Sequence, residues 1–395
     1  MLAGKRVVLG VTGSIAAYKS VFLVRLLQQA GAVVRVVMTS AAAKFIAPLT
    51  FRTLTREPVM VDLWDDQFSW SHHVQLGLWA EVVLIAPCTV NTIAKITTGL
   101  CEDAVSAVCY TTQAPVVIAP AMDREMHNHP KTQANLAELT QRGCTIIDAE
   151  TGYLASGLEG AGRMAEPEDI IEQLEQILAD HKLTAKKILI TAGPTQESLD
   201  PVRFISNHSS GKMGFALARA ARNLGAAVTL VSGPVTLKIP KNINHQQVTT
   251  AQEMFETVTT QQNQYDIIIM CAAVADYRPE TTATQKVKKN QDEWTIRLIK
   301  NPDILLHLGQ HKPANQKLIG FALETTDEIK HAHEKMIRKN LNMIVLNSLN
   351  TPNAGFGYDT NAVTLLFPSN ISKSFSVDSK QKLAYEILLE ITNLD

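Results

Sequence analysis

The chain has 395 residues, of which 46% are hydrophobic and 19% charged, with a formal net charge of -1. This length exceeds what one ordinary hydrophobic core holds, so we expect two domains, and the composition is globular and suggests neither a disordered nor a membrane protein. A net charge this small gives no general attraction for polyanions, which disfavours nucleic acid as the main partner.

The N-terminus begins with a basic pair and an apolar run, as secretory signal peptides do. Gly10, Gly13 and Lys19 interrupt that run, so we interpret it as the first core strand. No segment approaches the roughly 18 unbroken apolar residues of a membrane helix. The five cysteines are scattered, without a CxxC motif. We therefore expect a cytoplasmic protein with reduced thiols that contacts no membrane.

Short apolar segments recur along the first half of the chain. They predict strands over residues 5–11, 33–38, 82–86, 116–119 and 145–147, with a helix after the turn TGSIAAYK. Near-continuous apolar strands are typical of a parallel sheet covered on both faces. Small or polar residues follow each strand, so candidate binding residues gather at the carboxyl edge of the sheet. The dinucleotide fingerprint GxGxxG is absent after the first strand, which disfavours NAD in its usual binding mode.

Two adjacent histidines stand in the stretch SWSHHVQLGLWAE. On a helix, His73 would share a face with Leu76, Gly77 and Ala80. A histidine on such a face is more often a satisfied structural residue than a catalytic one, and the residues alone leave both interpretations open.

The segments GSIAAYK, HHVQLGLWAE, VLIAPCTVNTIAK, VIAPAMDREM and GRMAEP follow one another in the first half. They resemble the flavin-dependent cysteine decarboxylase family. The resemblance implies an FMN-binding, flavodoxin-like domain, usually trimeric with the flavin at a subunit interface. Its substrate would be phosphopantothenoylcysteine, oxidised at the cysteine so that a thioaldehyde loses CO₂. The resemblance assigns catalysis to His73 and FMN contacts to Gly13, Ser14, Thr39, Ser40, Pro87, Thr89, Asn91 and Ser106.

Two positions depart from the pattern of that family. Asp123 stands where the family motif PAMN has asparagine, and Ser156 where it has a cysteine that donates a proton. A carboxylate would repel the substrate carboxylate, and a hydroxyl is a far weaker acid than a thiol. Both exchanges are nearly isosteric, so we expect FMN binding to survive and decarboxylation to be slowed. Cys144, nearby in sequence, is a candidate substitute for the donor.

A helical stripe over residues 167–182 ends the first half, and we place the domain boundary between residues 183 and 184. A strand over 188–191, a helix from Lys212 and a strand over 228–231 then repeat the order seen at the N-terminus. The loop SNHSSGKMG, residues 206–214, puts hydroxyls, glycines and a lysine before a helix N-terminus, which suits an anionic ligand. Its glycine spacing differs from the phosphate loop, and an ordinary surface turn is the alternative.

The rest of the second half predicts strands over residues 265–270, 317–325, 341–346 and 362–367, with helices over 301–309, 331–340 and 379–394. Alternation over 285–300 predicts an antiparallel hairpin. From the residues alone, lysines 286, 288 and 289 more often form a solvated edge, the usual fate of a run of charges, than a binding site. Lysines from separated segments, an acidic residue and Gly/Ser loops are what a nucleoside triphosphate with a divalent ion requires.

The segments TAGPTQESLDPVRFISNHSSGKMG, AAVADYR, KVKK, KNPDIL, GFALET and RKNL resemble the bacterial, CTP-using type of phosphopantothenate–cysteine ligase. The resemblance implies that the phosphopantothenate carboxylate attacks the α-phosphate of CTP, and that the cysteine amine then displaces CMP. It places Asn207 at the substrate or acyl-cytidylate, and it leaves the Mg²⁺ ligands unidentified. Nucleotide contacts fall on Met270, Cys271, Ala272, Asp276, Lys286, Pro302, Asp303, Ile304, Leu305, Phe321, Lys335 and Lys339.

Together the two resemblances imply two Rossmann-like, three-layer α/β domains, residues 1–183 and 184–395, in a bifunctional enzyme of coenzyme A biosynthesis. Trimeric flavin domains and dimeric ligase domains imply a homo-oligomer, a dodecamer. Two alternatives stay open. In one, only the ligase works because Asp123 and Ser156 impair the flavin domain. In the other, the flavin domain is a regulatory or scaffolding module.

Overall fold

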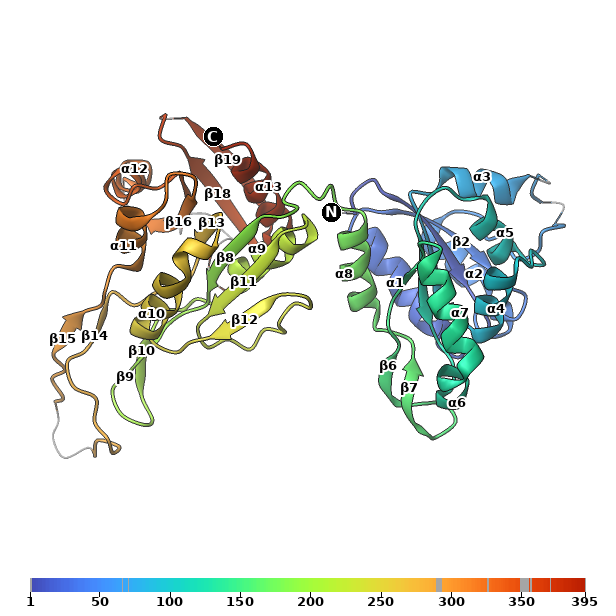
Figure 1. Ribbon diagram of the computed structural model, residues 1–395, viewed down its shortest axis with the longest axis horizontal. Coiled ribbons are helices and arrows are strands. Elements are labelled where there is room, and N and C mark those ends of the chain that lie inside the picture. The colour runs from blue at the N-terminus through green and yellow to red at the C-terminus, as the bar shows by residue number, and fades with distance from the viewer. Residues whose placement is uncertain are drawn as a thin grey trace. The chain divides into compact units, whose positions relative to one another are not determined.

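The computed structural model describes residues 2–65, 67–69, 71–288, 293–324, 327–348, 355, 357–369 and 371–394. Contacts divide the chain into two compact units, Met1–Leu178 and Ala179–Asp395 (Figure 1). Leu183 packs in the core of the second unit, where its backbone N–H donates to the Leu224 carbonyl. The boundary between residues 183 and 184 stays a prediction.

The first unit is built on a parallel sheet of strand order β2-β1-β3-β4-β5. In this register Leu9 lies opposite both Val36 and Leu84. The strands are β1 (Arg6–Val11), β2 (Val33–Met38), β3 (Val82–Cys88), β4 (Val116–Pro120) and β5 (Thr145–Ile146), and β6 (Glu150–Tyr153) pairs with β7 (Glu159–Arg163) in a separate hairpin. The helices are α1 (Ala17–Gln29), η1 (Ala42–Lys44), α2 (Pro48–Thr55), α3 (His72–Trp79), α4 (Val90–Thr98), α5 (Ala104–Thr111), α6 (Arg124–Asn128), α7 (Pro130–Gln141) and α8 (Pro167–Ile177).

Both faces of this sheet are buried, as its apolar strands predict. Val7 and Leu9 point into one hydrophobic cluster, with α1 and α8, and Val8 points into another, with α4 and α5. All seven residues of β3 are buried. The arrangement is a three-layer α/β fold in which the loops after β1, β2 and β3 meet at one edge.

The second unit has a sheet of order β12-β11-β8-β13-β16-β17-β18-β19, parallel up to β17 and antiparallel beyond it. The strands are β8 (Lys187–Ala192), β11 (Ala227–Ser232), β12 (Asn244–Gln247), β13 (Ile267–Met270), β16 (Lys317–Glu324), β17 (Met343–Ser348), β18 (Thr360–Leu366) and β19 (Ser372–Ser379). The helices are α9 (Lys212–Asn223), α10 (Ala251–Gln261), η2 (Gln262–Gln264), α11 (Ile304–His311), α12 (Glu328–Arg338) and α13 (Lys380–Thr392). Two separate hairpins pair β9 (Gln196–Ser198) with β10 (Phe204–Ser206), and β14 (Tyr277–Pro279) with β15 (Leu298–Lys300).

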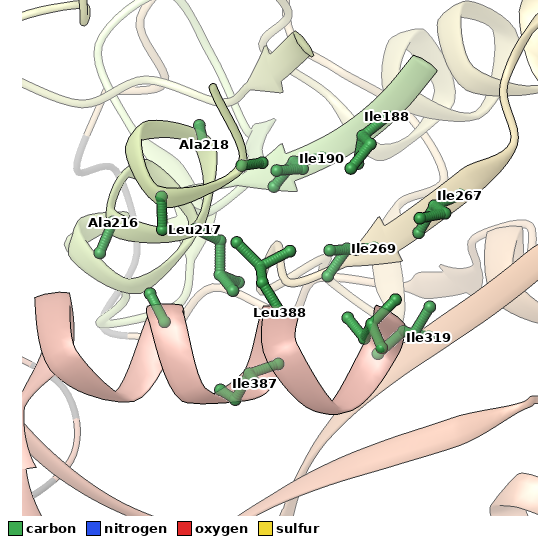
Figure 2. Packing of buried hydrophobic residues seen from close by; sticks show 14 of the residues in the cluster. Ile188, Ile190, Ala216, Leu217, Ala218, Ile267, Ile269, Ile319, Ile387 and Leu388 are labelled. Atoms are coloured by element: carbon green, nitrogen blue, oxygen red, sulfur yellow. The ribbon is translucent and has the colours of Figure 1, made fainter. Parts of the chain in front are cut away.

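The main core of the second unit lies between the sheet and the helices α9 and α13. Figure 2 shows Leu217 of α9 and Leu388 of α13 beside Ile190 of β8 and Ile269 of β13, and all four are fully buried. Burying a side chain of this size stabilises the fold by roughly 1.5–3 kcal/mol. The packing also brings the first residues of α9 and α13 to the same region.

The hairpin expected over residues 285–300 is wrong for the described part of that range. Leu298–Lys300 forms β15, but its partner is β14, with Tyr277 opposite Lys300. The N–H of Asn301 continues the pairing by donating to the Asp276 carbonyl. An alternating segment fixes which face is buried but not which strand it joins, so the sequence pattern did not identify the partner. Lys289 lies outside the described residues.

Candidate functional site

The first unit has a pocket of about 560 Å³ at the carboxyl ends of β1, β2 and β3, which we call the α4 pocket. The Thr12 hydroxyl joins two of its loops, donating to the Pro87 carbonyl at 2.8 Å and accepting from the Thr89 N–H at 3.0 Å. A Cβ at Gly13 would come within 2.6 Å of the Ala41 Cβ, so the first loop requires glycine. The pocket is lined by Gly13, Ser14, Thr39, Ser40, Ala41, Thr89, Val90, Asn91, Thr92, Lys95, Glu102, Asp103, Ala121, Met122 and Met126.

Carboxylates already neutralise the cation of the α4 pocket. Lys95 Nζ lies 3.0 Å from Asp103 and 3.2 Å from Glu102. The hydrogen bond that Lys95 donates to Asp103, opposed by burial, raises the pKa of Lys95. Asp103 also caps α5 by accepting from the Ser106 N–H at 2.9 Å, and the Ser106 hydroxyl donates to the Asp103 carbonyl. Ser106 and Pro87, both expected to contact FMN, are thus not among the residues that line the pocket. They are hydrogen-bonded to residues that position the lining.

A second pocket of about 350 Å³ adjoins the β6–β7 hairpin, and we call it the hairpin pocket. It brings together Asp123 and Ser156, the two departures from the family pattern. Asp123 caps α6, accepting from the Arg124 N–H at 2.7 Å, and makes no ion pair with any described residue. The Ser156 hydroxyl oxygen accepts from the Leu158 N–H at 3.4 Å, in the hairpin turn.

The cations of the hairpin pocket share one carboxylate. Lys19 is 4% exposed, and its Nζ donates to the Met164 carbonyl at 2.8 Å and to Glu166 at 2.9 Å. Arg163 pairs with the same Glu166. Asp123 is therefore left as the negative group of this pocket without a partner of opposite charge in the described structure.

The structure does not bring His73 or Cys144 into either pocket. His73 lies on α3, where its carbonyl accepts from the Thr111 hydroxyl at 3.1 Å, and its buried Nδ1 has no hydrogen-bond partner among the residues described. Burial raises the pKa of the half-buried Cys144 thiol, which packs against the cluster around Ile118.

The second unit has two adjoining pockets at the carboxyl ends of β8, β13 and β16. The α9 pocket, of about 330 Å³, contains the loop before α9. The Asn207 amide donates to the Ala273 carbonyl at 2.9 Å. A Cβ at Gly214 would lie 2.5 Å from the Ala192 Cβ, so glycine lets α9 begin directly against β8. The lining is Asn207, Ser209, Ser210, Gly211, Lys212, Met213, Gly214, Cys271, Ala272, Ala273, Val274, Asp276, Phe321, Ala322, Leu323, Lys335, Asn347, Gly355, Asn361 and Lys380.

The α11 pocket, of about 170 Å³, shares Lys335 and Asp276 with the α9 pocket. Asp303 caps α11, accepting from the Leu306 N–H at 3.0 Å, and pairs with Lys339 at 2.8 Å. Burial alone would raise the pKa of Asp303, but the Lys339 and Leu306 bonds outweigh it and leave it lowered. The lining is Met270, Ala272, Val274, Ala275, Asp276, Lys300, Asn301, Pro302, Asp303, Ile304, Leu305, Phe321, Lys335 and Lys339.

Lys335 is a cation that lines both pockets and is left without a carboxylate partner among the described residues. Its Nζ donates to the Phe321 carbonyl at 3.2 Å, and it forms no ion pair within the described part of the unit. Burial, and then the charge of Lys339, lower its pKa. The residues expected to bind nucleotide thus come together in the two joined pockets, with Lys286 as the exception.

Lys286 is exposed and lines neither of these pockets. The next residue, Val287, is held by its N–H to Asp200 at 3.2 Å and by its carbonyl, which accepts from Arg203 at 2.9 Å. Arg203 also stacks over the Trp294 ring at 4.5 Å. The position of Lys286 is therefore fixed by a polar anchor outside the pockets of its own chain.

Sequence reasoning missed Lys380, Asn347 and Asn361 in the α9 pocket. Asn361 Nδ2 donates to Asn347 Oδ1 at 3.1 Å. Asn347 ends a parallel strand at the carboxyl edge, a signal that could have found it. Nothing in the sequence pointed to Lys380, which reaches the pocket because α13 packs beside α9.

Within the described ranges, no three His, Cys, Asp or Glu side chains gather into a group that could hold a metal ion. Those ranges also contain no helix long and apolar enough to cross a membrane.

Two family models account for nearly the whole chain. The Flavoprotein family matches residues 1–179, and the DNA/pantothenate metabolism flavoprotein C-terminal domain family matches residues 183–394. The crystal structure of the C-terminal domain of the coenzyme A biosynthesis bifunctional protein CoaBC is 43% identical, covers 54% of this chain and 97% of that one, and has a TM-score of 0.47.

Full-length relatives show the same pairing. The coenzyme A biosynthesis bifunctional protein CoaBC of Vibrio vulnificus (strain YJ016) is 45% identical over 396 residues, covering 100% of this chain and 98% of the relative. The protein of the same name from Escherichia coli (strain K12) is 45% identical, with 99% and 97% covered. A cysteine/cysteine sulfinic acid decarboxylase from an unknown prokaryotic organism is 47% identical, with 88% and 99% covered. The chain therefore belongs to the CoaBC family of bifunctional coenzyme A biosynthesis proteins, which pair a flavin-dependent decarboxylase with a ligase.

Proposed function

We propose that the second unit joins phosphopantothenate to cysteine at the expense of CTP, and that the first unit decarboxylates the product with FMN. The observation that carries the ligase half is the joined α9 and α11 pockets. They place the SNHSSGKMG loop and the lysines 335 and 339 around one continuous site. A triphosphate and a carboxylic acid can lie there together.

The ligase chemistry follows from the charges of the site. A free carboxylate is a poor electrophile, so its oxygen attacks the α-phosphate of CTP, and pyrophosphate leaves. The cysteine amine then attacks the acyl-cytidylate carbonyl and expels CMP. Lys335 and Lys339 stabilise the charge that develops on the phosphates, which is often the largest contribution to catalysis. Asn207, at the pocket rim, holds the acyl group by neutral hydrogen bonds.

Mg²⁺ would be held mainly by the phosphates. Asp276 and Asp303 are the carboxylates lining the α11 pocket, and Asp303 is already committed to Lys339 and to the α11 cap. Mg²⁺ commonly binds through one or two carboxylates together with substrate phosphates. Asp276 is therefore the protein group best placed for it.

The α4 pocket suits FMN because neutral donors dominate its lining and Gly13 leaves room for a close approach. Thr39, Ser40, Thr89 and Asn91 would hold the phosphate and the flavin ring. Bound FMN would supply two-electron oxidation of the cysteine side chain and later return the electrons. Ser14, Ala121 and Met122 line both this pocket and the hairpin pocket, so the substrate cysteine would reach the flavin from the hairpin side.

A cytoplasmic homo-oligomer would complete both sites. His73 and Lys286 lie outside the pockets of their own units, although the family pattern assigns each a role in catalysis or binding. The simplest arrangement in which His73 and Lys286 take part in these sites is one in which each reaches a pocket of a neighbouring subunit. A trimeric flavin domain with a dimeric ligase domain would give a dodecamer, and sedimentation of the full chain measures this directly.

Two assays test the proposed function. Lys286→Ala should suppress CTP-dependent pyrophosphate release while leaving bound flavin intact, and full ligase turnover in this variant would refute the assignment of Lys286. Release of CO₂ from phosphopantothenoylcysteine measures the decarboxylase half. Because of Asp123 and Ser156, we expect slow release, with some product leaving as the ene-thiol. A normal yield of phosphopantetheine would contradict this expectation.

A second substrate for the hairpin pocket is favoured by Asp123. A carboxylate without an ion-pair partner in the described structure attracts a cation, and free cysteine carries an ammonium that N-acylated cysteine lacks. The relative named as a cysteine/cysteine sulfinic acid decarboxylase supports the same choice. We therefore expect CO₂ release from cysteine to exceed release from N-acetylcysteine, and Asp123→Asn to abolish the difference. Equal rates with both compounds in the unaltered protein would exclude this candidate.

A further inference from the structure

Lys380 is a buried cation in the wall of the α9 pocket, and no role in the reaction has been derived for it above. It is the first residue of α13 and is 7% exposed. Its Nζ donates to the carbonyls of Gly355 at 2.9 Å and Tyr358 at 2.6 Å. Both acceptors are uncharged carbonyl groups, so neither of them cancels the positive charge of the ammonium. Because lysine has three donors, one remains for a ligand.

The surroundings of Lys380 do not balance its charge. Lys212, the first residue of α9, lies close enough to lower the pKa of Lys380 further, after burial, which has the larger effect. The charge of Asp359 raises the pKa of Lys380, a smaller effect than burial and Lys212, which lower it. Asp359 pairs with Lys212 at 2.7 Å, and its side chain is 88% exposed, so water screens it. A buried ammonium in this situation is costly unless an anion joins it.

The joined pockets hold two groups of cations, and one lysine lines both pockets. Lys300, Lys335 and Lys339 line the α11 pocket, and Lys335 also lines the α9 pocket. Lys212 and Lys380 line the α9 pocket, together with the Ser209–Gly211 loop at the N-terminus of α9. The positive end of a helix adds to the attraction for an anion there. The proposed ligase reaction also brings two phosphorylated substrates, a nucleoside triphosphate and a phosphomonoester of a carboxylic acid.

We propose that Lys380 binds the phosphomonoester of the acid substrate in the α9 pocket and makes the ligase select the phosphorylated over the unphosphorylated acid. The proposal rests on the ligase function proposed above. The α11 pocket then takes the triphosphate, and the acid extends between the two cation groups with its carboxylate toward the α-phosphate. Lys380 is thus a specificity-determining residue, and the test must separate it from a lysine that merely anchors the carbonyls of Gly355 and Tyr358.

The test compares two acids that differ only by the phosphate. Phosphopantothenate and pantothenate are titrated into the full-length protein and into Lys380→Gln, Lys380→Arg and Lys382→Gln. Lys382 is the matched control, because it lies on the same helix, exposed and paired with Asp378. We expect Lys380→Gln to weaken the binding of phosphopantothenate about 10- to 100-fold, as for loss of a charge-assisted hydrogen bond. Its affinity for pantothenate should change less than about 2-fold, and Lys380→Arg should retain part of the affinity for phosphopantothenate.

Each other outcome counts against the proposal. Equal losses for both acids in Lys380→Gln would make Lys380 an anchor only, and a rise in KM for CTP alone would assign it to the nucleotide. If Lys380→Gln fails to fold, Lys380→Arg decides, because it keeps the charge and moves the donors. Its binding ratio of the two acids must then differ from that of the unaltered protein. Absence of CTP-dependent pyrophosphate release in the unaltered protein would instead refute the proposed ligase function.

Discussion

The two units use the same strand–turn–helix design but treat their cations differently. In the first unit Lys95 is neutralised by Asp103 and Glu102, and Lys19 by Glu166. In the second unit Lys335 and Lys380 are hydrogen-bonded to backbone carbonyls. The first unit thus holds Lys19 and Lys95 in ion pairs. The second unit pairs Lys212 and Lys339 with carboxylates but leaves Lys335 and Lys380 without a carboxylate partner in the described structure.

The difference matches what each half would bind. FMN carries a single phosphate, which hydroxyls, amides and backbone N–H groups can hold without excess positive charge. CTP and an acid phosphomonoester bring many more negative charges into one site, and cations that are already paired would have to give up their partners to receive them. A neutral-lined pocket and a cationic one can therefore be made at the same edge of similar sheets.

The largest effect expected is in the ligase half. Lys335→Met removes a half-buried cation from the pockets proposed to bind the phosphates, so CTP-dependent pyrophosphate release should fall about 10²- to 10³-fold, typical of losing one group that stabilises the transition state. Lys330→Gln, an exposed change on the same helix, serves as the control and should leave the rate within about 2-fold. Quantifying pyrophosphate release at saturating phosphopantothenate gives both rates. Comparable losses in the two variants would show that the charge of α12 as a whole matters.

A smaller change is expected in the hairpin pocket. Asp123→Asn removes the carboxylate that we expect to repel the substrate carboxylate, and phosphopantothenoylcysteine decarboxylation should rise about 10-fold, a value typical of relieving one close like-charge contact. Ser156→Cys should instead change the product, raising phosphopantetheine relative to the ene-thiol, because a thiol donates its proton more readily. Product analysis by mass spectrometry separates the two effects. An unchanged rate in Asp123→Asn would mean that Asp123 does not face the reacting carboxylate.

The sequence predicted the fold and much of the ligase site for a physical reason. Apolar runs locate parallel strands, and the small or polar residues after them must meet at one edge, so the SNHSSGKMG loop and Asp276 could be placed at that edge in advance. The resemblance added Asn207, Phe321, Lys335 and Lys339. What it could not supply is pairing between distant segments. The β14–β15 partnership and the approach of Lys380 both depend on tertiary packing that leaves no local pattern.

The pH dependence of the two halves offers a finer test. Burial lowers the pKa of Lys335, while Asp103 raises that of Lys95. An ordinary lysine has a pKa near 10.4, and Lys335 therefore loses its charge at a lower pH than that. KM for CTP should accordingly rise as the pH increases toward the ordinary lysine value. FMN affinity should stay constant over the same interval. Measured KM values for Lys335→Arg, which stays charged, should lack the alkaline rise. A rise of the same size in that variant would assign the titration to another group.

The smallest effect concerns helix caps, which also differ between the units. Both α5 and α10 begin with a capping box, but Asp103 at α5 lines the α4 pocket, whereas Thr250 and Glu253 at α10 line none of the pockets described above. Thr250→Ala loses the bond to the Glu253 N–H, 3.1 Å in length, and should destabilise the second unit by about 1 kcal/mol.

Thermal unfolding of the full chain should then show a fall of about 2–4 °C in the transition of the second unit, with flavin release unchanged. The control is Thr260→Ala on the same helix, whose hydroxyl donates to the Glu256 carbonyl at an exposed site and whose loss should have little effect. Because the cap of α10 stands apart from any pocket, Thr250→Ala should leave pyrophosphate release unaltered at temperatures below unfolding. An altered KM for CTP would mean that α10 transmits strain to the site, and the separation of cap and pocket in the second unit would then be wrong.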